Sequence, residues 1–241
     1  DRLGALITKT LTRQPRDGHS PPRLVETPSG MLNAVGLQNI GLKAFLTETL
    51  PQLRRYQVPV IVSVLAESAD ELAAMVQQLD RADGVAAVEL NLSCPNLKTQ
   101  KMVAQDADAT FAMVQAATQQ TTKPILAKLS PDVTDMVPIA QAAERAGATA
   151  LSLVNTFTGM SLDPSTRRSR LGALTGGLSG PAIRPLAVYR VWSVAQAVRL
   201  PLIGVGGIMR AEDALEFVIA GATAVAVGTG NFVDPRTPLR V

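Results

Sequence analysis

Short apolar runs alternate along this chain with longer segments whose apolar residues recur at helical spacing. The runs are rich in β-branched residues, and most lack a regular apolar–polar alternation, which is typical of parallel strands covered on both faces. We therefore predict seven parallel strands. They begin at Gly4, Val58, Ala86, Pro124, Ala150, Pro201 and Ala224 and read GALITKT, VPVIVSVL, AAVELNLS, PILAKLS, ALSLVNT, PLIGVGG and AVAVGTG.

The segments between the runs are predicted to be helices. The clearest opens with Ser68 and Glu71 at capping-box spacing and stops at Gly84. A first helix over 42–53 contains Pro51, which we expect to kink or break it. The remaining helices are expected over 108–120, over 134–147 with its start at Thr134, within 183–198, and over 210–221.

Alternation of strands and helices predicts an α/β fold, either a doubly wound sheet or a (β/α)8 barrel. A barrel needs eight strands and a final helix, so a barrel would lack its first strand and last helix in this chain. The predicted strands end in TKT, NLSCPN, KLS, VNT, GVGG and VGTG. Polar groups and glycines converging from many strand ends are what a barrel active site requires, which favours the barrel. No linker divides the chain, and we predict one domain over 1–241.

Composition narrows the functional classes. The net charge is only +3 and no dense Lys/Arg block is present, because STRRSR (165–170) reads as a solvated loop, so nucleic-acid binding has little support. A single cysteine excludes an internal disulfide and is simplest in a reducing cytoplasm. No apolar run approaches the roughly 18 residues of a membrane span. The chain begins at Asp1 rather than Met, so we expect an upstream segment to be missing.

Glycines at the last two strand ends suggest a phosphate site. Gly206-Gly207 and Gly228-Thr229 each precede a predicted helix, and without a Cβ atom the backbone N–H groups can approach a phosphate closely. Each pair alone could simply make a tight turn. Together, after the last two strands, they match the phosphate position of many barrels.

Lysine and asparagine side chains supply further candidate chemistry. Lys9 and Lys128 interrupt apolar strands, and either extends to a rim or faces an anionic ligand; Lys128 would suit the edge of a reduced flavin that becomes negative. Asn33, Asn91 and Asn155 either cap turns or read a planar ring with alternating N–H and C=O groups. Taken together they favour a flavin mononucleotide (FMN) site beside a small polar heterocycle.

Cys94 is the one cysteine and lies past a strand in a polar turn before Pro95. A lone cysteine is more often an inert buried residue, but this position suits a thiolate that acts as nucleophile or base. Nucleophilic cysteines usually need a histidine, and the only one, His19, lies in a distant loop. A base role therefore fits better. No Cys/His cluster predicts a metal site.

These residues resemble the class 1 dihydroorotate dehydrogenases, and most closely the catalytic subunits of class 1B. The similarity covers nearly the whole chain in the family's order, and ELNLSCPN together with GMLNAVGLQN is specific. The matching motifs are ETPSGMLNAVGLQNIGL (26–42), ELNLSCPN (89–96), AKLSPDVTD (127–135), VNTFTGM (154–160), TGGLSGPAIRPLA (175–187), GVGGI and AGATAVAVGTGNF.

The resemblance implies FMN-dependent oxidation of (S)-dihydroorotate to orotate in pyrimidine biosynthesis. Cys94 would take a proton from C5 while a hydride passes from C6 to flavin N5. Electrons would leave through a partner subunit carrying FAD and an iron–sulfur cluster, with NAD as acceptor, in a cytoplasmic enzyme that is also a homodimer. Neither nucleic acid nor membrane is expected as a partner.

The resemblance also assigns site residues. Substrate contacts fall on Lys9, Asn33, Ala34, Val35, Gly36, Leu37, Asn91, Asn155 and Thr156, and FMN contacts on Lys9, Thr10, Ser63, Asn91, Lys128, Val154, Gly180, Gly206, Gly207, Gly228 and Thr229.

Two departures and three alternatives accompany this reading. Ser63 stands where an asparagine is expected, so its hydrogen bond to FMN would be lost or water-mediated. The loop LKTQKMVAQDAD (97–108) lacks the family's glycines and phenylalanine, which alters the expected cover of the site. The alternatives are a fumarate-linked class 1A enzyme, which GMLNAVGLQN argues against, a tRNA-dihydrouridine synthase, whose basic extension is not seen, and a truncated non-catalytic barrel.

Overall fold

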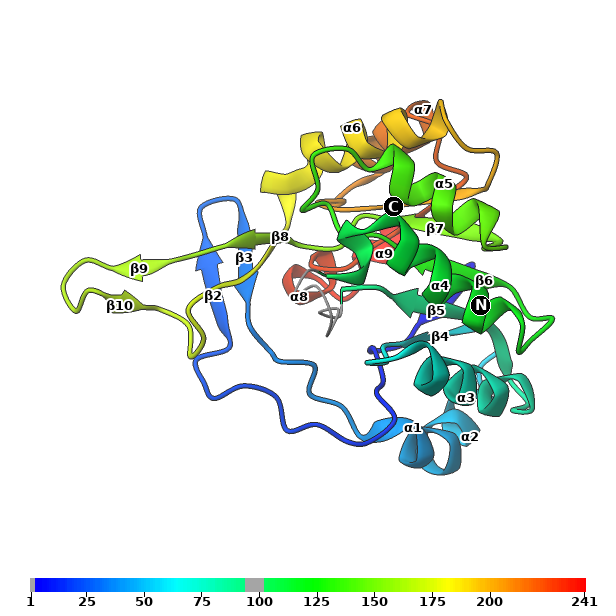
Figure 1. Cartoon of the computed structure of the whole chain (residues 1–241). Helices are drawn as coiled ribbons and strands as arrows, with labels where there is room; N and C mark the ends of the chain where they lie inside the picture. Colours follow the sequence, from blue (N-terminus) through cyan, green and yellow to red (C-terminus); the bar gives the residue numbers. More distant parts are fainter. Residues whose placement is uncertain (1–2, 94–101) are drawn as a thin grey trace.

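A seven-stranded parallel sheet forms the centre of the protein (Figure 1). The computed structural model describes residues 3–93 and 102–241. All seven predicted strands are confirmed, and they pair in the order β1-β4-β5-β6-β7-β12-β13. Their bounds are β1 Leu6–Ile7, β4 Val60–Val64, β5 Val85–Asn91, β6 Ile125–Lys128, β7 Ala150–Leu153, β12 Leu202–Val205 and β13 Ala224–Ala226.

Helices follow the strands and cover one face of the sheet (Figure 1). This repeated strand–helix unit, with every strand parallel, is that of a (β/α)8 barrel, as predicted. Seven of a barrel's eight strands lie in this sheet, with β1 and β13 at its edges. The helices are α1 Gly41–Ala44, α2 Leu50–Leu53, α3 Ala69–Asp80, α4 Ala107–Thr118, α5 Val137–Arg145, α6 Arg184–Ala195, α7 Ala211–Ile219, α8 Gly230–Val233 and α9 Thr237–Arg240, with 3-10 turns η2 Val103–Gln105 and η3 Pro181–Ile183.

The helix predicted over 42–53 is continuous but not uniform. Between α1 and α2 the backbone forms one π-helical stretch, η1 Phe45–Thr49, and the N–H of Leu50 bonds to the carbonyl of Phe45. Pro51 has no N–H to donate, so a widened turn immediately before it absorbs the irregularity without ending the helix.

Helix starts partly follow the prediction. Ser68 Oγ accepts from the N–H of Glu71 at 3.1 Å, but the Glu71 carboxylate accepts from the N–H of Glu67, one residue before the expected partner. The capping box is therefore half formed. The prediction that a helix starts at Thr134 was wrong, because Asp135 Oδ1 accepts from the N–H of Val137 at 2.9 Å and α5 begins there.

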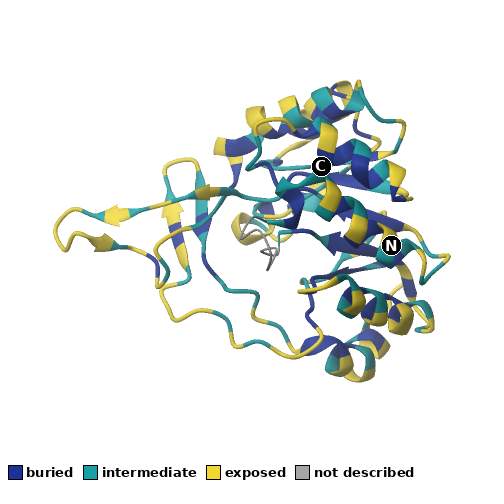
Figure 2. Ribbon diagram, in the orientation of Figure 1, coloured by how far each residue is buried: buried dark blue, intermediate teal, exposed yellow. Residues whose placement is uncertain are grey.

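The two faces of the sheet differ in polarity. Val62 and Val88 on the outer face are both 0% exposed. The central strands are largely buried beneath the helices (Figure 2). Side chains alternate along a strand, so Ser63 and Glu89 point to the opposite, inner face. Both are also buried, at 1% and 2% exposed. The inner face therefore carries buried polar groups that lead toward the strand ends.

An antiparallel sheet beside the strand ends was not predicted from the sequence. It has the order β2-β3-β11-β8 and joins residues near 30 to residues near 177 (Figure 1). Its own small core is formed by Val25, Leu32, Ala34 and Leu171. The bounds are β2 Leu24–Thr27, β3 Gly30–Asn33, β8 Phe157–Gly159 and β11 Gly176–Ser179, with a projecting hairpin of β9 Leu162–Asp163 and β10 Arg168–Ser169.

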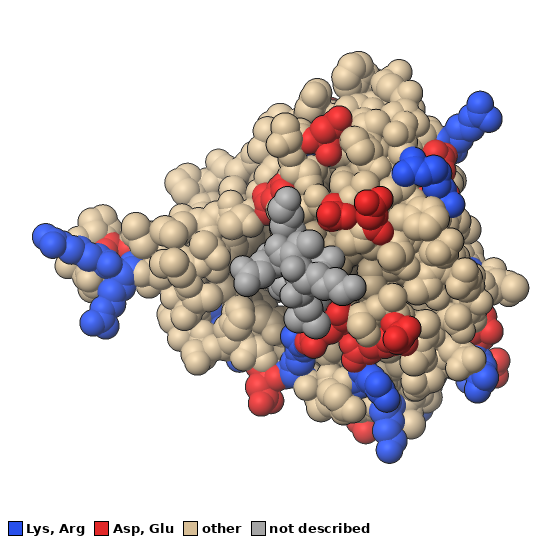
Figure 3. All heavy atoms as spheres, in the orientation of Figure 1, with Lys and Arg blue, Asp and Glu red and all other residues tan. Residues whose placement is uncertain are grey.

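The surface mixes charges of both signs. On the face in Figure 3 basic and acidic side chains are interspersed, and basic groups also project at the far end of the β9–β10 hairpin. Among the described residues, the helices are all too short or too polar to cross a bilayer.

Candidate active site

Side chains at the C-terminal ends of the parallel strands meet on one rim of the sheet. Asn91 ends β5 and Lys128 ends β6, and the two are paired in the strand register. Asn155 follows β7 by two residues, and Ser93 follows β5 by two. Cys94, the predicted base, and the first part of the loop predicted to be an atypical cover lie outside the described residues.

Hydrogen bonds join the predicted asparagines to one another. Asn155 Nδ2 donates to Asn91 Oδ1 at 3.2 Å and to Ser93 Oγ at 2.5 Å. Asn91 Nδ2 donates to Thr10 Oγ1 at 3.2 Å. Three strand ends, those of β1, β5 and β7, thus contribute to one polar network, as the sequence pattern predicted. Ser93 had not been predicted, although it lies in the same motif as Asn91.

A cleft lies beside this network, at the ends of β6, β7, β12 and β13. It gathers nine of the predicted ligand residues and five that were not predicted, all of them neighbours of the glycine motifs. The predicted ones are Lys128, Val154, Asn155, Thr156, Gly180, Gly206, Gly207, Gly228 and Thr229; the others are Ser179, Ile183, Val205, Ile208 and Gly230.

The cleft has the donors that a phosphate needs. Among the described residues, the backbone N–H groups of Gly207, Ile208, Gly228 and Thr229 donate to no other protein group. A Cβ added at Gly228 would meet nothing within 4 Å, so its absence leaves room in the cleft. Gly207, at φ +70°, would instead drive a Cβ to 2.7 Å from the Gly180 carbonyl oxygen. The residues present therefore fit a phosphate-bearing cofactor such as FMN.

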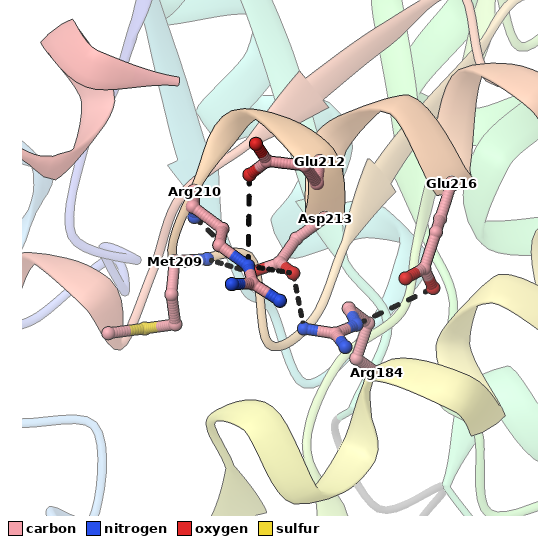
Figure 4. A network of polar contacts seen from close by, with 6 residues as sticks. All are labelled: Arg184, Met209, Arg210, Glu212, Asp213 and Glu216. Atoms are coloured by element: carbon pink, nitrogen blue, oxygen red, sulfur yellow. Dashed lines mark hydrogen bonds and ion pairs between the residues drawn. The ribbon is translucent and has the colours of Figure 1, made fainter.

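An ion-pair network (Figure 4) lies next in sequence to Ile183 and Ile208, which line this cleft. Asp213, near the start of α7 and 1% exposed, accepts from the N–H groups of Met209 and Arg210 at 2.9 and 3.2 Å. Arg184, at the start of α6, bonds to the same carboxylate and to Glu216. Burial opposes ionisation, but the Met209 N–H, the Arg184 charge and Arg210 outweigh it, so the pKa of Asp213 lies below its ordinary value. The network thus ties the loop after β12 to the loop before α6.

Two lysines give the rim a positive charge. The pKa of Lys9 is lowered, first by partial burial of its ammonium and second by the charge of Lys128. The side chain as a whole is exposed, so the desolvation of its ammonium is only partial. Among the described residues, every ion pair uses an arginine, and neither lysine has a carboxylate partner. Two unpaired cations at one rim suit an anionic ligand.

Some predicted residues lie apart from the cleft lining. The segment from Asn33 to Leu37 follows β3 on the antiparallel sheet, where Asn33 Nδ2 donates to the Gly177 carbonyl at 3.3 Å. His19 Nδ1 lies 3.2 Å from the Ala34 carbonyl in the same region. Ser63 is buried on the inner face, and its hydroxyl contacts Thr10 and Glu89, so the structure places it behind the rim.

Parallel strands, outer helices and a ligand cleft at the strand C-termini define the class of (β/α)8-barrel proteins whose active site lies at that rim. Within this class, the model of the dihydroorotate dehydrogenase family matches residues 1–241. The chain belongs to this family.

Its relatives include several proteins named "Dihydroorotate dehydrogenase B (NAD(+)), catalytic subunit". The chain is 55% identical to the one from Desulforudis audaxviator over 97% of this chain and 76% of the relative. It is 52% identical to that of Geotalea uraniireducens, over 98% and 77% of the two chains. The Geobacter sulfurreducens protein is 50% identical over 100% and 79%. The predicted class 1B resemblance is confirmed.

Proposed function

We propose that this protein oxidises (S)-dihydroorotate to orotate in de novo pyrimidine biosynthesis, with FMN as its cofactor. The observation that carries the proposal is the cleft at the strand ends, which lies beside the asparagine network. Among the described residues, four of its backbone N–H groups donate to no protein group, and Lys9 and Lys128 at the same rim have no carboxylate partner. Donors for a phosphate, amides for a planar ring and charges for an anion are the groups that FMN and a pyrimidine carboxylate need. Family membership supports the same reaction.

The cofactor would be held by residues from several strand ends. Gly206, Gly207, Gly228 and Thr229 would bind its phosphate, while Lys128 would lie at the ring. The remaining proposed FMN contacts are Lys9, Thr10, Ser63, Asn91, Val154 and Gly180. When bound, the flavin supplies a two-electron acceptor that takes the hydride from substrate C6 at N5.

The pyrimidine would be bound by amides and by a lysine. Asn91 and Asn155 share a hydrogen bond and so present a fixed pair of polar groups, and Lys9 would meet an anionic oxygen. The remaining proposed contacts are Asn33, Ala34, Val35, Gly36, Leu37 and Thr156. The 33–37 segment would approach the ligand from the antiparallel sheet.

Cys94 is proposed as the general base. Its thiolate removes the C5 proton, the C5–H electron pair becomes part of the new C5=C6 double bond, and the hydride leaves from C6. The position of Cys94 directly after Ser93, whose hydroxyl accepts from Asn155, supports this role. A thiol is acidic enough that part of it is ionised near neutral pH, and the resulting thiolate can act as the base.

The reduced cofactor would be reoxidised through a second protein. The relatives are named catalytic subunits of an NAD(+)-linked enzyme. This chain has one cysteine, and an iron–sulfur cluster usually needs four, so a partner subunit with FAD and a cluster would carry electrons to NAD. We further propose a single domain over 1–241, a homodimer and a cytoplasmic location.

Flavin absorbance tests the proposal. Purified protein should be yellow or take up FMN, and anaerobic dihydroorotate should bleach the absorbance as orotate forms. Fumarate alone should not restore the colour, whereas the partner subunit with NAD should. Protein that is folded but cannot be reconstituted with FMN would overturn the proposal, and FMN protein left unbleached by dihydroorotate would overturn the substrate.

A further inference from the structure

A buried carboxylate lies behind the asparagines of the candidate active site. Glu89 on β5 is 2% exposed and faces the same side of its strand as Asn91, two residues later. Ser63 Oγ donates to Glu89 Oε1 at 3.0 Å, while Oε2 has no hydrogen-bond partner among the described residues. Burying a carboxylate with so few partners costs free energy, so packing does not explain its presence.

Hydrogen bonds lead outward from Glu89 in one direction only. Ser63 has one hydroxyl proton and gives it to the carboxylate, so Thr10 must donate in its 3.0 Å contact with Ser63 Oγ. Thr10 then offers only lone pairs outward, and it accepts from Asn91 Nδ2 at 3.2 Å. Asn91 Oδ1 accepts in turn from Asn155. In this series of hydrogen bonds, from Asn155 to Glu89, every donor therefore points toward Glu89.

Two backbone groups select the same orientation of the amides. The N–H of Ser93 lies 3.3 Å from Asn91 Oδ1, and the N–H of Thr156 lies 2.8 Å from Asn155 Oδ1. Only the oxygen of an amide can accept them. After these bonds, and counting described residues only, Asn91 keeps one N–H and Asn155 keeps one oxygen lone pair.

We propose that Glu89 is a positioning residue for ligand recognition at this site. As the terminal acceptor, it fixes the hydroxyls of Ser63 and Thr10 so that Asn91 presents an N–H, and Asn155 a carbonyl oxygen, to the ligand. This pair complements a ring edge with a C=O beside an N–H, as in a lactam or cyclic ureide. The inference rests on the proposed function for identifying that ligand as a pyrimidine.

Removing the acceptor should disturb the pair. Without Glu89, the Ser63 hydroxyl can turn to Thr10, and the Thr10 proton then faces the N–H of Asn91. Two donors in contact repel, and flipping the amide would instead set its NH2 against the N–H of Ser93. Either outcome shifts or misorients Asn91.

Two variants of the FMN-loaded protein distinguish the hydrogen-bond acceptor of Glu89 from its negative charge. Glu89→Met removes the acceptor, whereas Glu89→Gln keeps an oxygen for Ser63. We expect Glu89→Met to raise the Kd for orotate about tenfold, as for one lost hydrogen bond. Glu89→Gln should stay within about threefold of wild type. The Tm of Glu89→Met should not fall, because an unsatisfied buried carboxylate is removed. Orotate binding is read from the perturbed flavin spectrum and Tm from circular dichroism.

A double-mutant cycle tests whether Glu89 acts through Ser63. Ser63→Ala should cause a similar loss of orotate affinity by itself, and adding Glu89→Met should then cost less than about twofold more. Because Ser63→Ala carries its own expected loss, the test stands even if Glu89→Met does not fold.

Several results would overturn the inference. They are orotate binding as tight as wild type in Glu89→Met or Ser63→Ala, equal losses in the Gln and Met variants accompanied by a lower Tm, and full additivity in the cycle. All three leave the proposed function standing, because wild-type protein still binds orotate. Wild-type FMN protein that neither binds orotate nor is bleached by dihydroorotate would instead overturn the proposed function, and the inference with it.

Discussion

At the scale of single residues, the proposed chemistry depends on Cys94. Replacing it with alanine removes the base and leaves every described residue that lines the cofactor cleft in place. We predict that Cys94→Ala retains FMN and slows bleaching by dihydroorotate by roughly 10²- to 10⁴-fold, the usual contribution of a general base. Cys94→Ser should retain little activity at neutral pH, because a hydroxyl is far less acidic. Stopped-flow absorbance measures both, and an unchanged bleaching rate in the alanine variant would refute the assignment.

Lys9 predicts a pH dependence of ligand binding. Its pKa is lowered from 10.5 by burial and by Lys128, so its positive charge disappears at a lower pH than that of an ordinary lysine. An anion binds the charged form, so orotate affinity should fall as pH rises through this lowered pKa. Lys9→Met should weaken binding about tenfold at neutral pH and remove this pH dependence. Lys128→Met should shift the midpoint upward.

Binding titrations between neutral pH and pH 11 check this prediction. The exposed Lys43 on α1 offers a matched control, and Lys43→Met should leave the affinity and its pH profile unchanged. A midpoint that stays in place when Lys128 is replaced would contradict the electrostatic coupling.

At the scale of elements, the sequence predicted the strands of the parallel sheet but not those of the antiparallel sheet. All seven parallel strands were found because each is an apolar run of β-branched residues followed by a glycine or polar end. The antiparallel sheet escaped because strands such as β3 (GMLN) and β11 (GGLS) are four residues long and without period. Their pairing joins Leu32 to Leu178, which no local pattern reveals.

The site was predictable to the same limit. Glycine pairs and asparagines at strand ends indicate a binding site by their residue type alone, so most residues of the cleft were predicted. Glu89 was not, because its proposed role depends on Ser63 on β4 and on Thr10 after β1, which are distant in the sequence. Similarly, nothing near Asp213 in the sequence indicates that Arg184 is its partner, 29 residues earlier.

The Arg184–Asp213 pair predicts a link between cofactor binding and stability. Arg184→Met leaves a buried carboxylate with fewer partners, which should cost about 3 kcal/mol in the free energy of unfolding and weaken FMN binding by loosening the glycine loops. Arg210→Met is the matched control, because Arg210 reaches the same carboxylate with a side chain 69% exposed and should cost under about 1 kcal/mol. Urea unfolding and flavin fluorescence measure the two effects.

The pH dependence of the same pair has a definite sign. The pKa of Asp213 is depressed in the folded protein, so its stabilising contribution is present above the ordinary value of 3.8 and is lost as pH falls through the folded value. Asp213→Asn should therefore lose stability at neutral pH and show a shallower decline in acid. For the two arginine variants, equal losses in the free energy of unfolding in Arg184→Met and Arg210→Met would argue against a structural role for the buried pair.

At the scale of the whole molecule, one buried cluster spans the sheet and its helices from Leu11 to Ala222, while the antiparallel sheet has a small cluster of its own. If 1–241 is one domain, the two clusters should unfold together. We predict a single urea transition in which far-UV circular dichroism and the fluorescence of Trp192, the one tryptophan, coincide.

Two core substitutions sharpen this last prediction. Leu151→Ala lies in the main cluster at 0% exposed and Leu32→Ala in the small one at 3%. Each should cost about 2–5 kcal/mol and shift the same transition for both probes. The two clusters are linked, because Phe157 on β8 packs against the main cluster and is paired with Leu178 on β11, which packs against the small one. If Leu32→Ala shifted only an early circular dichroism phase and left the Trp192 transition in place, the antiparallel sheet would be a separate folding unit. The 33–37 segment, which follows β3, would then move with that sheet without unfolding the barrel.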